Sequence, residues 1–434
     1  MSEQPAAKTP ERLMSLDAYR GFTMLMLVAG GFGLRQAAEN GLRRDPETGL
    51  SLVAPDSVWH GFWEVMNFQF RHVDWLGCSL WDLVQPSFMF LVGTSMAYSY
   101  AKRAARGDSY GQLLRHAIGR AVILVLLGVF LRSSKPGVST TYWTFEDVLS
   151  QIGLGYVFLF LLWNRSVRFQ WIAAAAILVG YWVLFALWPV PADFDYEALN
   201  WQKQTFEGFW AHWNRGTNAG AEIDLWFWER FPESLNHVAP RHEYATLNFV
   251  PSLATMIFGL LVGGLLRSER SDRDKLVRLV VWGLVGVMGG LLIQSLGICP
   301  IVKKAWTPSW AIYSSGWATL FMAAFFAVIE MAGYRRWAFP SVVIGMNPIT
   351  AYVINELLRG WIVRMIDVHT RYVAFLINKH VLVLQHESTP SIFEIPFGPI
   401  YAPLYAPILQ NLVRLTVVFL ILLWMYRRKI FIRI

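Results

Sequence analysis

The chain alternates between long apolar runs and polar segments from one end to the other. Ten apolar runs stand out, at residues 15–34, 81–100, 118–132, 147–163, 170–188, 248–266, 279–298, 308–332, 340–363 and 405–426. A helix needs about 20 consecutive, mostly apolar residues to cross a bilayer, and the runs come close to that length. The pattern therefore predicts an all-α polytopic membrane protein with about ten transmembrane helices.

The polar segments between the runs differ in length and in charge. The segments 101–117, 164–169, 267–278, 333–339 and the C-terminal end are short and carry Arg or Lys, whereas those at about 35–80, 189–245 and 364–403 are long and hold most of the acidic residues. Short, basic segments usually stay in the cytoplasm. We therefore expect both termini in the cytoplasm and the three long segments outside it. Residues 1–11 are expected to be a disordered cytoplasmic tail, followed by a single transmembrane domain over 12–434.

The amino-acid composition also indicates a membrane protein, and it gives no sign of nucleic-acid or metal binding. Of its 434 residues, 55% are hydrophobic and 16% are charged, whereas an average soluble domain has about 25% charged residues. The net charge of +8 is accounted for by the basic short segments, so it gives no reason to expect nucleic-acid binding. Cys78 and Cys299 form no metal-binding motif. Both fall on the predicted outer side of the membrane, where disulfides can form. The sequence allows either a disulfide between them or two free thiols.

Residues 71–86, at the start of the second apolar run, concentrate reactive side chains at a predicted boundary between water and lipid. An imidazole can move protons near neutral pH, and a nearby carboxylate can fix its tautomer and make it a better base. We therefore expect His72 to be the catalytic centre and Asp82 to orient it. Asp74 is the weaker candidate for that role, because the alternation of side chains points it elsewhere.

Several motifs are spread along the chain in a fixed order. They are Arg12-Leu13-Met14-Ser15-Leu16-Asp17-Ala18-Tyr19-Arg20-Gly21, then His72-x-x-Trp75-x-Gly77 with Trp81-Asp82-Leu83-Val84-x-Pro86, then Ile223-Asp224, then Asn248 with Ser252, then Pro300-Ile301-x-Lys303-x-x-Trp306, and last Gly345-Met346-Asn347 with Tyr352 and Glu356. This series, which covers about residues 12–360, resembles the heparan-alpha-glucosaminide N-acetyltransferase family, whose members are lysosomal or bacterial.

The resemblance implies a fold, an activity and a location. Members of the family are polytopic membrane acyltransferases that take an acetyl group from cytoplasmic acetyl-CoA and pass it to an amino sugar on the other side of the membrane. It implies a bacterial inner-membrane protein whose partners are acyl-CoA, the lipid bilayer and an extracytoplasmic sugar or glycan with an amino or hydroxyl group. No metal is expected, and a homodimer is an open alternative to a monomer. One position departs from the family: an active-site asparagine is replaced here by Gly31, which predicts an acceptor other than heparan-type glucosamine.

The candidate site residues fall into three groups. The family's active-site histidine matches His72, and Asp82 is expected to support it. The expected cofactor-binding residues are Arg20, Lys102 and Arg103 for the CoA phosphates, with Asp17 as the partner of Arg20, and Asn248, Ser252 and Asn347 for an oxyanion or a pantetheine amide. The expected substrate-binding residues are Asp224, Lys303, Trp306 and Glu356. A carboxylate at the depth of Glu356 in a span is costly unless it faces water, so we expect a polar cavity there.

Each assignment has a structural alternative. His72 could be an interfacial histidine bonded within its loop, Asp82 a helix cap, and Asp17 with Arg20 a structural pair. Lys303 could extend its ammonium group to the membrane surface. A different class of function, secondary transport of a small solute, is the alternative for the whole chain. Transporters often contain inverted repeats, and the two halves of this sequence show no such symmetry.

Overall fold

The computed structural model describes residues 13–46, 49–135, 140–197, 201, 204–230, 243–377 and 391–432. Within these ranges the chain is helical, and its only β-type pairings are the isolated bridges Arg44–Ser51 and Leu76–Val302. The helices are α1 (Met14–Val28), α2 (Leu34–Leu42), α3 (Val58–Gln69), α4 (Val84–Ala104), α5 (Tyr110–Ser133), α6 (Val148–Trp163), α7 (Val167–Ala186), α8 (Ala219–Trp228), α9 (Phe249–Arg267), α10 (Asp272–Ser295), α11 (Pro308–Phe326), α12 (Phe339–Met346), α13 (Pro348–Ile377) and α14 (Gly398–Arg427).

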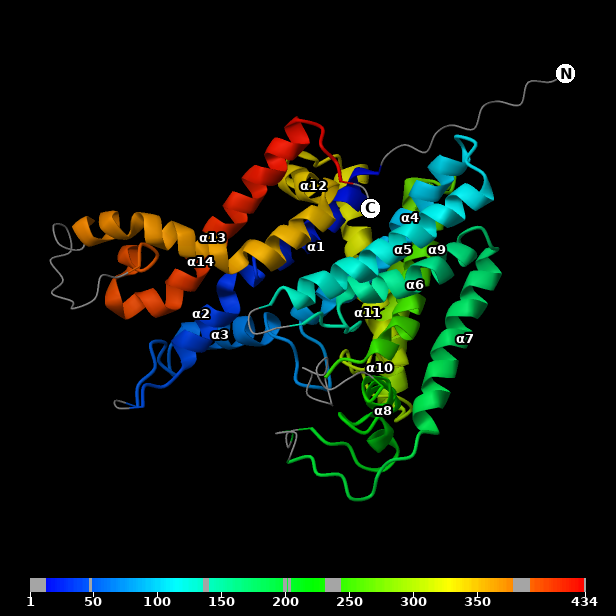
Figure 1. Cartoon of the computed structure of the whole chain (residues 1–434), viewed down its shortest axis with the longest axis horizontal. Helices are drawn as coiled ribbons and strands as arrows, with labels where there is room; N and C mark the ends of the chain where they lie inside the picture. The colour runs from blue at the N-terminus through cyan, green and yellow to red at the C-terminus, as the bar shows by residue number, and fades with distance from the viewer. Residues whose placement is uncertain are drawn as a thin grey trace.

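The helices form two groups that meet along the middle of the molecule (Figure 1). One group holds α4 to α7 and α9 to α11, and the other holds α1 to α3 and α12 to α14. The start of α1 and the end of α14 lie at the same edge of the molecule, together with the loop between α4 and α5. That edge corresponds to the predicted cytoplasmic face. The opposite edge carries α8 and the long connection that follows α7.

The all-helical membrane architecture is confirmed. Six described helices, namely α5, α7, α9, α10, α11 and α14, are long and apolar enough to cross a membrane, and α12 with α13 adds a seventh if this pair, bent by 73°, forms one span. Every predicted run falls on a helix, but α1 has 15 residues and α6 has 16. The count of about ten spans and the cytoplasmic placement of the termini therefore remain predictions.

Three predicted features differ from the structure. The first run was expected to continue to residue 34, but α1 ends at Val28 because Gly30, Gly31 and Gly33 all have positive φ and turn the chain into α2. The polar segment 35–80 is not simply a loop, since it contains α2 and α3. Likewise α13 extends to Ile377, well into the segment expected to be irregular, because its sequence contains no proline after its first residue to end it.

Close packing between α4 and α9 fixes the helix on which the candidate site is built. A Cβ atom on Gly93 would collide with the carbonyl oxygen of Met256, and one on Gly259 would collide with that of Phe90. The two backbones therefore approach as closely as glycine allows, as is common between membrane helices. Thr94 reinforces the contact by donating a hydrogen bond to the carbonyl oxygen of Gly259 at 3.0 Å.

Candidate active site

The candidate site is centred on the loop between α3 and α4, where Asp82 is buried and His72 is partly exposed. Asp82 lies in a single 3-10 turn, Trp81–Leu83, immediately before α4, and its side chain is 0% exposed. Its Oδ1 lies 2.7 Å from Nδ1 of His72. The imidazole, 43% exposed, forms part of a cavity wall.

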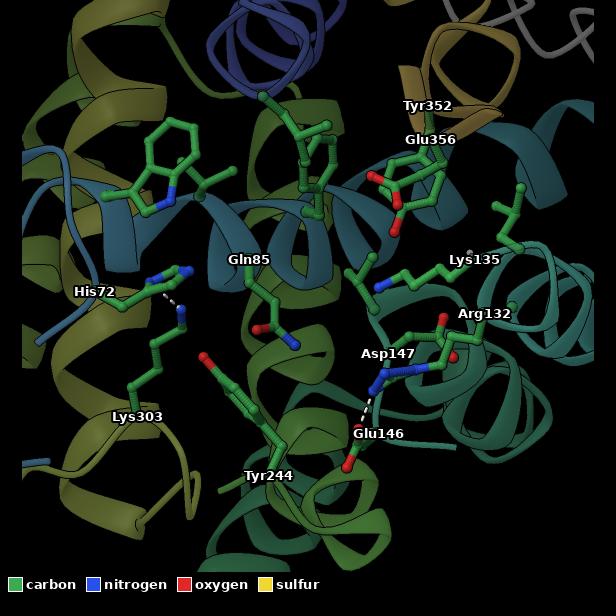
Figure 2. Close-up of a pocket in the computed structure, with 17 residues that line it drawn as sticks. His72, Gln85, Arg132, Lys135, Glu146, Asp147, Tyr244, Lys303, Tyr352 and Glu356 are labelled. Carbon is green, nitrogen blue, oxygen red and sulfur yellow. Dashed lines mark hydrogen bonds and ion pairs between the residues drawn. The ribbon is translucent and has the colours of Figure 1, made fainter. Parts of the chain in front are cut away.

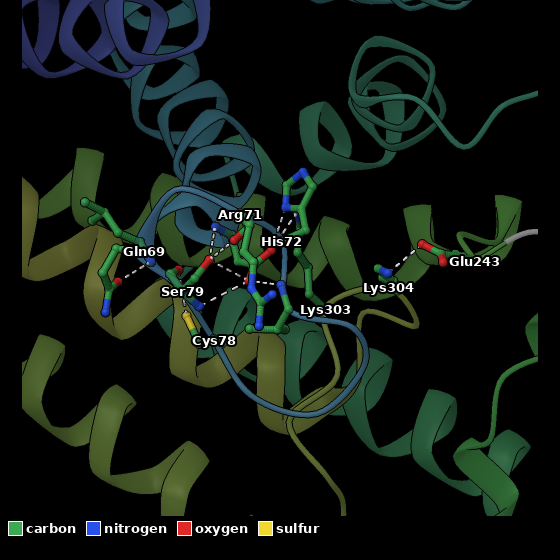
Figure 3. A network of polar contacts seen from close by, with 11 residues as sticks. Gln69, Arg71, His72, Cys78, Ser79, Glu243, Lys303 and Lys304 are labelled. Atoms are coloured by element: carbon green, nitrogen blue, oxygen red, sulfur yellow. Dashed lines mark hydrogen bonds and ion pairs between the residues drawn. The ribbon is translucent and has the colours of Figure 1, made fainter. Parts of the chain in front are cut away.

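The second oxygen of Asp82 holds the loop in shape. Oδ2 accepts hydrogen bonds from the backbone N–H groups of Val73 at 3.2 Å and Ser79 at 3.1 Å, and it lies 2.9 Å from the hydroxyl of Ser79. That hydroxyl also lies 2.6 Å from the carbonyl oxygen of Arg71 (Figure 3). One buried carboxylate therefore fixes both sides of the loop that presents His72.

Lys303 completes the polar cluster from a distant part of the chain. Its Nζ lies 3.2 Å from Oδ1 of Asp82 and 2.9 Å from Nδ1 of His72, and its side chain is 3% exposed. Buried ions are normally paired, and the pair Asp82–Lys303 meets that requirement. Figure 2 shows Lys303 next to His72, on the same side of the cavity, and Figure 3 shows the two side chains close together.

The loop that carries Lys303 is held by side chains of the surrounding helices. Asn248 donates to the carbonyl oxygen of Lys304 at 2.7 Å, and Tyr181 donates to that of Ala305 at 3.0 Å. Thr307, which caps the N-terminus of α11, accepts from the N–H of Val302 at 3.0 Å. The bridge between Leu76 and Val302 then joins this loop to the His72 loop.

The charges in the cluster influence one another. Burial acts to raise the pKa of Asp82, but the hydrogen bond with His72 and the charge of Lys303 outweigh it and hold that pKa well below its ordinary value. Burial lowers the pKa of Lys303, and the Asp82 carboxylate opposes this. Burial also lowers the pKa of His72, partly offset by its hydrogen bond to Asp82 and reinforced by Lys303. His72 is therefore mainly neutral at pH 7.

Two groups lie within hydrogen-bond distance of Nδ1 of His72: the Asp82 carboxylate, which only accepts, and the Lys303 ammonium, which only donates. In the tautomer that donates to Asp82, Nδ1 of the neutral ring carries the proton. Nε2 is then left with a free lone pair, and no described residue forms a hydrogen bond with it. The arrangement can supply a general base or a nucleophile at Nε2.

His72 faces a cavity of about 370 Å³ whose far wall is rich in charge. That wall contains Arg132 at the end of α5, Glu146 and Asp147 just before α6, and Glu356 on α13 (Figure 2). Arg132 forms an ion pair with Glu146. Burial raises the pKa of Glu146, opposed by Arg132. Gln85 and Tyr244 lie between the two walls in Figure 2, so the cavity presents polar groups on several sides.

A second, smaller cavity of about 110 Å³ lies next to the first. Phe88, Val148 and Tyr352 line both cavities, so the two cavities adjoin at these side chains. The second cavity is lined by Arg20 and Arg120, on parts of α1 and α5 that approach the predicted cytoplasmic face. His72 lines the larger cavity, and Arg20 and Arg120 line the smaller one beside it.

The structure brings several of the predicted site residues together. His72, Asp82 and Lys303 form one cluster, Glu356 lines the same cavity, and Arg20 lines the adjoining one. The polar cavity expected at Glu356 is present.

Other predicted residues lie away from these two cavities. Ser252 is buried and donates to Phe249 in its own helix, and Trp306 is buried with its indole N–H bonded to Thr255. Asp224 accepts from the N–H of Thr246 at 2.9 Å, and burial raises its pKa to about 6. These side chains support the surrounding loops and helices.

Three more predicted residues lie nearer the other end of the helices. Asn347 binds the C-terminal segment, donating to the carbonyl oxygen of Ile430 at 3.0 Å and accepting from the N–H of Ile432 at 2.9 Å. Arg103 pairs with Asp108 at 3.4 Å, and Lys102 is exposed next to it. Asn248, predicted to hold the cofactor, instead binds the loop of Lys303 as described above.

The pair Asp17–Arg20 also has a structural contact. Its ion pair is 2.7 Å long, and Arg20 donates a second hydrogen bond to the carbonyl oxygen of Gly345 at 2.8 Å from Nε. The pair therefore ties α1 to α12 while Arg20 still reaches the smaller cavity.

The prediction overlooked the charged wall opposite His72 and the residues between the walls. Gln85, Arg132, Glu146, Asp147 and Tyr244 all line the cavity. A signal was present for three of them, because Arg132, Glu146 and Asp147 stand at the ends of two predicted runs that share the outer side. Gln85 and Tyr244 carry no comparable signal.

Gly31 occupies a place where a side chain does not fit. Its φ is +60°, and a Cβ atom there would lie 2.7 Å from Cδ1 of Phe70 and 3.4 Å from the ring of Trp81. The space that a side chain at this position would use is therefore filled by Phe70, next to the His72 loop.

Cys78 and Cys299 are both free thiols in the structure, so the disulfide left open by the sequence does not form there. Burial is the main cause that raises the pKa of each thiol, to about 11 for Cys299. Neither is therefore poised as a thiolate nucleophile near neutral pH.

Comparison with known proteins identifies relatives. The family described as "Heparan-alpha-glucosaminide N-acetyltransferase, catalytic" matches residues 49–212, which include His72 and Asp82. The heparan-alpha-glucosaminide N-acetyltransferases of Homo sapiens and Mus musculus are 23% and 25% identical to the chain, over 81% and 75% of its length. The matches cover 54% and 55% of those relatives, so the chain spans about half the length of the curated relatives it matches.

Proposed function

We infer that this heparan-alpha-glucosaminide N-acetyltransferase-like protein is an integral-membrane acyltransferase that moves an acetyl group from acyl-CoA at the cytoplasmic face to an amino or hydroxyl group of an extracytoplasmic sugar or glycan. The observation that carries the proposal is the position of His72. Its ring is held by Asp82 and Lys303 and faces a polar cavity, and a second cavity adjoins the first through Phe88, Val148 and Tyr352.

The donor enters from the end of the molecule at which α1 begins. Arg20 and Arg120 line the smaller cavity, and guanidinium groups bind phosphate well. CoA would keep its nucleotide near that end and extend its pantetheine arm between the helices. The thioester would then pass Phe88 and Tyr352 to reach His72. Lys102 and Arg103, exposed or half-buried at the end of α4, add positive charge on the same face.

The chemistry needs an unprotonated Nε2 on His72. In direct transfer, Nε2 takes the proton of the acceptor amine or hydroxyl while that group attacks the thioester carbonyl, and the thiolate of CoA leaves and is protonated. In a two-step route, Nε2 attacks the carbonyl itself, the CoA thiolate leaves, and the acceptor then displaces the acyl group from the imidazole. In both routes Asp82 stabilises the positive charge on the ring and fixes its orientation. Lys303 holds Asp82 and is placed to counter negative charge on the carbonyl oxygen.

The acceptor binds on the charged side of the larger cavity. A sugar presents hydroxyl groups that pair with both carboxylates and guanidinium groups, and an amino sugar adds a positive charge. Glu146, Asp147 and Glu356 supply acceptors for such groups, and Arg132 supplies donors. The cavity volume of about 370 Å³ is in the range of small-molecule sites. It would hold the terminal residue of a glycan, with the remainder outside.

A vesicle assay tests the proposal directly. The protein is reconstituted with one face accessible, radiolabelled acetyl-CoA is added on the side of the α4–α5 loop, and glucosamine is enclosed on the other side as a probe acceptor. We expect labelled N-acetylglucosamine inside the vesicles and free CoA outside. Movement of glucosamine or another solute across the membrane without acetylation would support the transporter instead.

The pH dependence of transfer follows from the lowered pKa of His72. Its pKa lies below the ordinary value of about 6.5, and the group is active only when unprotonated. With an acceptor hydroxyl, which does not titrate in this range, the rate should therefore fall to half its maximum only at a pH below 6.5. A pH–rate profile at saturating acetyl-CoA measures this. A half-maximal rate on the acid side above pH 6.5 would contradict the assignment.

We also propose a location, a topology and an oligomeric state for the enzyme. The six long apolar helices support an integral membrane protein, and we place it in a bacterial inner membrane with both termini in the cytoplasm. A homodimer is included in the proposal and is measured by the mass of the protein in detergent. No metal takes part in the proposed reaction.

A further inference from the structure

A third cavity, also lined by polar groups, lies between α13 and α14, apart from the two cavities near His72. Its volume is about 500 Å³. The side chains that line it include three arginines, Arg359, Arg364 and Arg414, but only one carboxylate, that of Asp367. The lining therefore carries a formal charge of +2, and none of its residues lines the cavity that His72 faces.

In the part of the chain that the structure describes, the three arginines of this cavity are not paired with a carboxylate. Among the described residues, none of the three forms an ion pair, and Asp367 is engaged by the hydroxyl of Ser391. Arg414 is 3% exposed and donates to the carbonyl oxygen of Val28 from Nε at 3.2 Å and from an Nη atom at 2.7 Å. An arginine at the depth of a membrane helix is costly without an anion or water beside it, so such a residue marks a functional site.

A buried amide oxygen in the same cavity also has no partner. Asn411 is 8% exposed, and its Nδ2 donates to the carbonyl oxygen of Pro407 at 2.7 Å. Its Oδ1 makes no hydrogen bond. A buried acceptor without a donor costs free energy. A ligand that fills this site would therefore gain from carrying a hydroxyl group as well as an anion.

The two helices that line the cavity also carry exposed apolar side chains. Leu357, Leu358 and Trp361 on α13 are 40%, 37% and 57% exposed, and Leu412 on α14 is 42% exposed. A cationic cavity next to apolar helix surfaces matches an amphiphile, with its head in the cavity and its chains along the helices. Basic pockets between membrane helices bind the head groups of anionic lipids.

We propose that this cavity binds the head group of an anionic glycerophospholipid, with the phosphate held by Arg359, Arg364 and Arg414 and a head-group hydroxyl donated to Oδ1 of Asn411. Phosphatidylglycerol has both features. Phosphatidylcholine has the phosphate but carries a balancing positive charge and no hydroxyl. The same phosphate-ester chemistry exists in soluble form in glycerol 3-phosphate, which lacks the chains.

The test uses the full chain, purified in detergent, with thermal unfolding as the readout. A ligand that binds only the folded protein raises the melting temperature. Phosphatidylglycerol should raise it further as its concentration increases, and phosphatidylcholine should not. Glycerol 3-phosphate should have no effect at the same concentration, because it cannot use the apolar helix surfaces. A response to glycerol 3-phosphate equal to that of the lipid would mean that the site takes a free phosphate ester and would overturn the lipid assignment.

The variant Arg359→Gln/Arg364→Gln removes two exposed arginines from the cavity and leaves the buried Arg414 in place. Loss of charge-assisted hydrogen bonds should weaken the apparent affinity for phosphatidylglycerol by about tenfold or more. The matched control is Arg165→Gln/Arg168→Gln, which removes two exposed arginines between α6 and α7. If the control weakens the response as much as the cavity variant does, or if neither changes it, the response comes from general charge and the proposal is wrong.

Discussion

Replacement of His72 by alanine should reduce acetyl transfer from acetyl-CoA to glucosamine by about 10²- to 10⁴-fold, the usual contribution of a general base. The ring is the only described group at the cavity wall that combines a neutral, unprotonated nitrogen with a carboxylate that orients it. Its removal leaves the charged wall and the rest of the cavity lining in place. The assay measures both the release of CoA and the labelled product.

The controls separate a loss of chemistry from a loss of fold. The imidazole is 43% exposed, so its truncation should change the melting temperature little. His60→Ala is the matched control, because His60 lies on α3, outside the cavity, where it pairs with Glu64 at 3.6 Å. That variant should transfer acetyl groups at the normal rate. Undiminished turnover by the His72→Ala protein, inserted and folded, would refute the proposed role of His72.

Replacement of Asp82 by asparagine should have the next largest effect, and it should act on both stability and rate. The change keeps the shape of the side chain but leaves the ammonium group of Lys303, 3% exposed, without its counter-ion. Removing one partner of a buried ion pair costs about 3–5 kcal/mol, and loss of a proton from Lys303 will reduce that cost. We expect a clearly lower melting temperature and a loss of activity close to that of His72→Ala.

A second substitution tests whether the ion pair is the cause. In Asp82→Asn/Lys303→Met the unpaired charge is gone, so much of the melting temperature should return while activity stays low. Lys303→Met alone should be less destabilising than Asp82→Asn, because the carboxylate keeps its hydrogen bonds to Ser79 and Val73. If the double variant is no more stable than Asp82→Asn, the buried charge of Lys303 is not the source of the instability.

These variants should also move the acid limb of the pH–rate profile in opposite directions. Lys303 lowers the pKa of His72 and Asp82 raises it. Residual activity of Lys303→Met should therefore decline at a higher pH than that of the unmodified protein, and residual activity of Asp82→Asn at a lower pH. A purely structural role for the two residues would change the rate without shifting the limb.

Several features of the fold could be predicted from local sequence. The apolar runs were sufficient to locate the helices, because a span must satisfy its own backbone hydrogen bonds inside the membrane. They were less informative about the ends of helices. The left-handed glycines after Val28 shortened α1, and the absence of proline after Pro348 let α13 continue to Ile377. Both outcomes depend on how the chain turns or packs as well as on its hydrophobicity.

The sequence by itself determined that this is a helical membrane protein and singled out His72, Asp82 and Lys303, because their side-chain chemistry is unusual at the end of an apolar run. Only the tertiary structure decided that Lys303 reaches Asp82, which lies 221 positions earlier in the chain. It also decided that Asn248 and Asn347 bind backbone groups and that Arg132, Glu146 and Asp147 face His72 across a cavity. The physical reason is that helix formation depends on neighbouring residues, whereas a polar site depends on which loops the packed helices bring together.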